Sequence, residues 1–145
     1  MSIETKSPSE EEMRRGFGLA SRYPASDSDA RTIESTVVQH LEGVDLNKKD
    51  AELGVDDANK IEHAADLLRP FNIERATLLY KRAIEIHRLA TIRAISDKSL
   101  YRVEESGANW LALLEKLGDR ESWEKIRQQI NTALGKEKFK EFTLR

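Results

Sequence analysis

Hydrophobic positions recur with the period of an α-helix along most of the chain. Ile33, Val37 and Leu41 are spaced four residues apart, which places them on one face of a helix that follows residue 29. A second amphipathic run starts after Asp56 and stops at Pro70, because the residue before a proline avoids helical backbone angles. The pattern therefore predicts two helices in the first half of the chain.

The segment from Ile73 to Ile95 contains neither glycine nor proline. Asn72 stands before it, and asparagine is a favoured residue for capping the start of a helix. Apolar residues in this segment cover more than one stripe of the helix surface, which is typical of a helix with neighbours on several sides. We therefore expect a long central helix.

Two more helices are expected after the polar break at residues 96–99. One runs from Leu100 to Leu117, with Leu100 itself on the apolar face, and stops at Gly118. The other carries Trp123 and ends at Gly135. Gly107 lies on the apolar face of the first of them, where a residue without a side chain permits close helix approach. Trp110 and Trp123 fall on apolar faces on either side of the turn at residues 118–119. We expect both in the core, with a partner-binding hot spot as the alternative.

Strand signals are nearly missing, since no short stretch alternates apolar and polar residues with β-branched enrichment. The sequence predicts an all-α fold, a four- to five-helix antiparallel bundle over residues 29–135. Residues 1–28 contain two of the three prolines, and we expect a flexible N-terminal arm with a short helix from Ser9 to Arg15. Residues 136–145 form a charged C-terminal tail.

Composition narrows the function classes. The chain has 145 residues, of which 34% are charged, and it has no cysteine, so disulfides, thiolate metal sites and cysteine nucleophiles are excluded. No apolar run approaches the roughly 18 residues of a membrane span. The acidic N-terminal stretch at residues 10–12 is unlike a secretory signal. We expect a cytoplasmic protein without a membrane partner.

Charge is unevenly distributed along the chain. Residues 69–102 hold 8 Lys and Arg against 3 Asp and Glu, whereas residues 1–68 hold 8 against 15. The basic side chains with the most prominent positions on the central helix are Lys81, Arg82, Arg88 and Arg93. Internal pairing with the acidic first half is the favoured interpretation, and binding of a nucleic acid or another polyanion is the alternative.

Catalytic and metal-binding patterns are not recognisable. His40, His63 and His87 each lie on an expected helix, but none stands three residues after a glutamate, the spacing of bundle-core metal sites. We expect these histidines to face solvent or to cap helices. Glycine-rich phosphate loops and nucleophile motifs are missing as well. The sequence predicts no enzyme activity, no metal and no cofactor.

By elimination, the sequence predicts a non-catalytic helical module that binds another protein, as an adaptor, regulator, inhibitor or assembly subunit. The expected partner-binding residues are four apolar side chains in the terminal segments and four cations on the central helix: Phe17, Leu19, Phe139, Phe142, Lys81, Arg82, Arg88 and Arg93. The two C-terminal phenylalanines can either pack back or bind a partner. Homo-oligomerisation is a further expectation. The alternative function is nucleic-acid or polyanion binding by residues 69–102.

Overall fold

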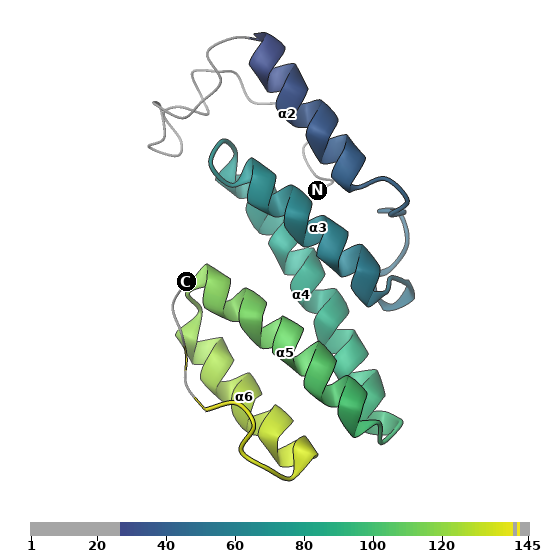
Figure 1. Cartoon of the computed structure of the whole chain (residues 1–145), viewed down its shortest axis with the longest axis vertical. Coiled ribbons are helices and arrows are strands. Elements are labelled where there is room, and N and C mark those ends of the chain that lie inside the picture. The colour runs from purple at the N-terminus through teal and green to yellow at the C-terminus, as the bar shows by residue number, and fades with distance from the viewer. Residues whose placement is uncertain (1–26, 141, 143–145) are drawn as a thin grey trace. The chain divides into compact units, whose positions relative to one another are not determined.

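The computed structural model describes residues 27–140 and 142, and all regular structure in that part of the chain is helical (Figure 1). The elements are α2 (Asp27–His40), the short 3₁₀ helix η2 (Asp50–Glu52), α3 (Val55–Leu68), α4 (Ile73–Ser96), α5 (Leu100–Leu117) and α6 (Arg120–Leu134). The predicted all-α class is confirmed. The expected arm at residues 1–28, including its short helix, lies outside the described residues except for its last two positions.

The helices end where the sequence places capping residues. The Asn72 side-chain oxygen accepts a hydrogen bond from the Arg75 backbone N–H at 3.1 Å, and Asp119 accepts one from Ser122 at 3.1 Å. Gly118 and Gly135 adopt left-handed φ angles of 71° and 72°, which close α5 and α6. These predicted helix boundaries are confirmed.

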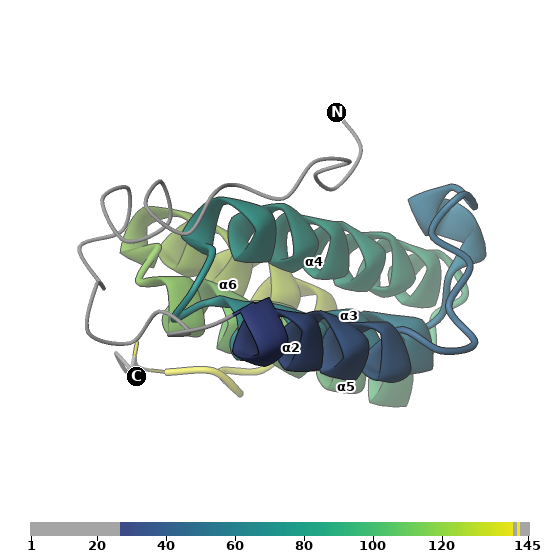
Figure 2. The same cartoon turned by 90° about the horizontal axis from the view of Figure 1, so that it is seen from above.

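Residues in contact group into two compact units. The first unit contains residues 27–47 and 56–83 of the described chain, and the second contains residues 48–55 and 84–142. Figure 2 shows α4 as one uninterrupted helix. Its first eleven residues belong to the first unit and the remainder to the second. Because α4 supplies side chains to two cores, its apolar residues cover more than one stripe. The expectation of one bundle over residues 29–135 stays a prediction.

The core of the first unit is lined by small side chains. Ala58, Ala65 and Ala76 are fully buried. Tyr80 of α4 and Val37 of α2 are buried as well, so α2, α3 and α4 each contribute apolar side chains to the interior of this unit.

Tyr80 is held in its protonated form by its surroundings. Its hydroxyl donates a hydrogen bond to the Asp66 carboxylate, and the Arg69 guanidinium lies 5.7 Å from its ring centroid. Burial, followed by the hydrogen bond and the negative charge of Asp66, raises the pKa of Tyr80 above its ordinary value.

This raised pKa predicts a loss of stability in alkali. Above about pH 10 the unfolded chain releases the Tyr80 proton while the folded chain keeps it, so the free energy of unfolding falls by about 1.4 kcal/mol per pH unit. We expect Tyr80→Phe to remove this contribution in urea unfolding between pH 9 and 11. Tyr101→Phe is the matched control, because Tyr101 is 76% exposed and its replacement leaves the slope unchanged. Equal slopes for wild type and Tyr80→Phe contradict the assignment.

The second unit is organised around a hairpin of α5 and α6, which lie side by side (Figure 1). Its core combines residues of α4, α5 and α6: Ala94, Val103, Trp110, Leu111, Leu114, Trp123, Ile130 and Leu134. Both tryptophans belong to this core, as predicted. Leu100 was expected on the apolar face, but it is 56% exposed. It is the first residue of α5, one turn before the first buried residue of that helix.

Gly107 permits close contact between α5 and α6. A Cβ at this position would lie 2.9 Å from Ile130 Cδ1 and 3.1 Å from its Cγ2. We expect Gly107→Ala to lower the free energy of unfolding by about 1 kcal/mol net, because overpacking outweighs the gain in helix propensity. Ile130→Val removes the nearest atom, so it should cost less in the Gly107→Ala background than in wild type. Additive effects in urea unfolding of the four proteins would disprove the contact.

Candidate functional site

Three of the four predicted cations on α4 interact within their own unit. Arg82 Nη1 donates to the Leu46 carbonyl at 2.6 Å, and Arg93 Nη2 donates to the Ala51 carbonyl at 3.1 Å. Arg88 donates to both Glu85 carboxylate oxygens, at 2.8 and 2.5 Å. Lys81 is exposed on α4. Internal interaction was expected for these cations, and each of the three donates to a group of the protein itself.

Arg75 also pairs with the acidic first half of the chain, through an ion pair with Glu34 of α2.

Further along α4, the hydrogen bonds from Arg88 lower the pKa of Glu85. The bonds to Glu85 in turn raise the pKa of Arg88. The Glu85–Arg88 pair therefore stays ionised at neutral pH.

The predicted apolar residues of the terminal segments divide into two groups. Phe17 and Leu19 lie outside the described residues. Phe139 and Phe142 pack against the core of the second unit, and the Phe142 ring stands edge-on to Trp123 at 5.6 Å with an interplanar angle of 82°. Of the two alternatives for the C-terminal pair, the structure has them packed back.

Asn131 of α6 holds this C-terminal strap, which we define as residues 136–140 and 142. Its side-chain oxygen accepts from the backbone N–H groups of Lys138 and Phe139, each at 3.1 Å. Its amide nitrogen donates to the Phe139 carbonyl at 2.9 Å and to Glu137 at 3.2 Å. One buried side chain thus fixes the path of the strap along α6.

The histidines differ in their surroundings. His40 and His63 are exposed, with ring centroids 6.2 Å apart. His87 is fully buried on α4, so the expectation that it faces solvent or caps a helix is wrong. It lies on the same buried stripe as Ala83 and Thr91, one turn away on either side. No group of three potential metal ligands occurs among the residues that the structure describes.

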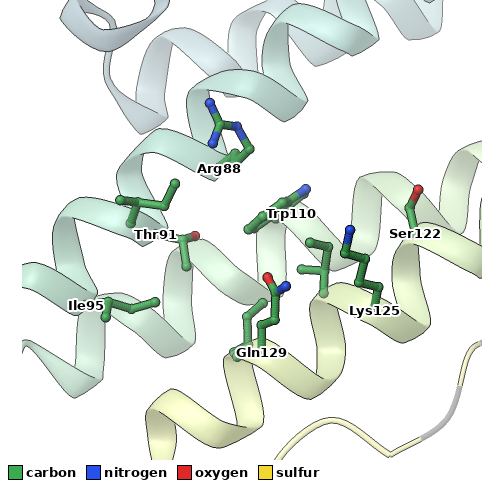
Figure 3. Close-up of a pocket in the computed structure, with 10 residues that line it drawn as sticks. Arg88, Thr91, Ile95, Trp110, Ser122, Lys125 and Gln129 are labelled. Atoms are coloured by element: carbon green, nitrogen blue, oxygen red, sulfur yellow. The ribbon is translucent and has the colours of Figure 1, made fainter.

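A groove opens between α4 and α6 in the second unit (Figure 3). Its volume is about 320 Å³, and we call it the α4–α6 groove. Ile92 and Ile95 line the α4 side, Ile126 and Lys125 line the α6 side, and Trp110 of α5 forms the floor. The groove therefore combines an aromatic floor, aliphatic walls and a lysine.

Helical spacing explains why these side chains converge. The lining residues of α4 occupy positions 88, 91, 92 and 95, and those of α6 occupy positions 122, 125, 126, 129 and 130. Both sets follow the i, i+3, i+4, i+7 pattern of one helix face. Each helix thus presents two turns of one face to the groove.

The isoleucines of the α4 wall remain open to solvent. Ile92 is 47% exposed and Ile95 is 42% exposed, although large aliphatic residues are usually covered. Sequence reasoning missed them as functional candidates because it interpreted every apolar residue of α4 as facing a neighbouring helix. The sequence did contain one indication, because α4 has more isoleucines than a single buried face of a helix can hold.

No family model, curated protein or solved structure matches the chain. The chemistry of the candidate site therefore comes from its own residues. Within the described part of the chain, no helix is long and apolar enough to cross a membrane.

Proposed function

We propose that the chain is a non-catalytic protein–protein interaction module that binds its partner in the α4–α6 groove. The observation that carries the proposal is the exposure of Ile92 and Ile95 beside an aromatic floor formed by Trp110. Covering a half-exposed isoleucine contributes roughly 1 kcal/mol. Apolar side chains around an indole are typical of the small clusters that supply most of the binding energy in protein interfaces.

The groove is long enough for only a few side chains of a partner. Its lining residues span about 10 Å on α4 and about 12 Å on α6 at 1.5 Å per residue. A partner can place two or three side chains in this length. Such an interface favours a transient complex unless the partner also contacts residues outside the groove.

The alternative function, polyanion binding by residues 69–102, has weaker support. Arg82 and Arg93 already donate hydrogen bonds to backbone carbonyls of the protein, so a polyanion would have to displace these carbonyls or share the two cations with them. This alternative predicts retention on heparin that falls steeply with salt. Lack of retention at low salt would remove it.

Ile92→Glu tests the proposed groove. With the full chain immobilised, we expect partner proteins from the native source to be retained at least tenfold less by Ile92→Glu than by wild type, because a carboxylate replaces an apolar anchor. Tyr101→Glu is the control, since Tyr101 is exposed in the same unit but does not line the groove. Quantitative mass spectrometry compares the three proteins. Retention that is unchanged in Ile92→Glu, or reduced equally in Tyr101→Glu, contradicts the proposal.

A further inference from the structure

We infer that the α4–α6 groove binds an amphipathic helix of another protein that carries acidic residues beside its apolar anchors. This inference rests on the function proposed above and adds the chemistry of the partner. It depends on the charges that line the groove, on the length of its walls and on the symmetry that self-association would impose.

Charge complementarity indicates an acidic partner. Two cations line the groove, Arg88 on α4 and Lys125 on α6, and no aspartate or glutamate lines it. Figure 3 shows them on opposite sides of Trp110. A carboxylate placed beside an apolar anchor on Trp110 therefore meets positive charge on either wall, and a lysine in the same place is repelled.

Both cations have capacity for a partner carboxylate. Arg88 uses Nε and Nη2 for Glu85, which leaves the N–H donors of Nη1. The Glu85–Arg88 pair is about 40% exposed, and such surface pairs contribute only about 0–1 kcal/mol, so sharing Arg88 costs little. Lys125 is exposed and makes no ion pair with another described residue.

The dimensions of the walls match a helix. Anchors at positions i, i+4 and i+7 of a bound helix span about 10 Å, which fits within the about 10 Å that α4 lines and the about 12 Å that α6 lines. A third helix that packs on two others inserts its ridge of side chains between theirs. The exposed isoleucines of α4 and Ile126 of α6 form the two sides of such a space.

A second copy of the chain fits this groove less well. In a twofold symmetric dimer the same surface meets itself, so Arg88 and Lys125 of one copy would approach the same cations of the other. Like charges brought together at an interface oppose association. A partner with the opposite charge avoids this cost.

Two synthetic helical peptides with fluorescent labels test the inference on the full-length chain. Both carry leucines at the three anchor positions; one has glutamates beside them and the other has lysines at the same places. We expect fluorescence anisotropy to give at least tenfold tighter binding of the acidic peptide, with an affinity that falls as salt rises. Equal affinities, or binding of neither peptide, overturn the inference.

Substitutions on the protein complete the test. Lys125→Glu should reduce the affinity for the acidic peptide at least tenfold and narrow or reverse the preference. Lys81→Glu introduces the same charge change on α4 outside the groove, and it should leave the preference intact. If Lys81→Glu and Lys125→Glu act equally, the effect is one of net charge and the inference is wrong.

Other occupants give distinct results, and each overturns the inference. A second copy produces a dimer in light scattering that Ile92→Glu abolishes. If the chain's own N-terminal residues occupy the groove, the peptides bind only after residues 1–26 are deleted. If the groove instead binds a small amphiphile, dodecanoate binds saturably and neither peptide binds. If Ile92→Glu abolishes partner capture while the peptides show no charge preference, the groove function stands and only the acidic helix is refuted.

Discussion

Trp123→Ala is expected to lower the free energy of unfolding by about 3–5 kcal/mol, the cost of removing a large buried aromatic side chain. Trp123 is 2% exposed, the Phe142 ring meets it edge-on, and the Arg127 guanidinium lies 5.8 Å from its ring centroid. All of these contacts are lost in alanine. Urea unfolding followed by circular dichroism measures the change.

Trp123→Phe provides the matched control. The Trp123 indole nitrogen is buried and has no hydrogen-bond partner among the described residues, so phenylalanine loses volume but no hydrogen bond. We expect this substitution to cost less than half as much as alanine. Equal costs for the two variants, or an alanine cost below about 1 kcal/mol, would show that Trp123 is not the centre of this core.

Asn131→Leu should release the C-terminal strap, at a cost of about 2–4 kcal/mol for its four hydrogen bonds. Leucine has nearly the shape of asparagine but neither donor nor acceptor. In a Trp110→Phe background, where Trp123 is the remaining tryptophan, we expect its emission to shift to longer wavelength as Phe142 withdraws. Hydrogen exchange at residues 136–140 should become faster in parallel.

Asn131→Asp separates the two halves of this interaction. Aspartate keeps an oxygen for the N–H groups of Lys138 and Phe139, but it loses the donor to the Phe139 carbonyl and repels Glu137. We expect the free energy of unfolding and the exchange rates of the strap in Asn131→Asp to lie between those of wild type and those of Asn131→Leu. A strap that stays protected from exchange in Asn131→Leu would mean that the phenylalanines alone hold it.

Local signals in the sequence were sufficient to place the helices. Asn72, Gly118 and Gly135 act through their own backbone and side-chain chemistry, so their effect on helix ends is readable without tertiary structure. Gly107 was also predictable, because a glycine on an apolar face has few other uses than close packing. The errors at Leu100 and His87 concern burial, which depends on what covers a side chain rather than on its type.

Recognising the candidate site required knowing which side chains are covered by other parts of the protein. An apolar residue at Ile92 has the same pattern whether a helix covers it or solvent does, so periodicity cannot distinguish a core face from a groove. The sequence did not single out Lys125 either, because its proposed role depends on its position across the groove from Arg88 of α4. In the sequence, Asn131 is an ordinary polar residue of a helix. Its role becomes visible only in the structure, where the backbone N–H groups of the strap donate to its side chain.

Methyl NMR of the full-length chain tests directly whether the partner binds in the α4–α6 groove. With isoleucine δ1-methyl groups labelled, we titrate a partner captured by wild type and lost in Ile92→Glu. If the partner occupies the groove, we expect the methyl signals of three of its isoleucines, Ile92, Ile95 and Ile126, to shift, while those of Ile33 and Ile61 in the first unit do not. Shifts confined to the first unit, with no change at the groove isoleucines, would contradict binding in the groove.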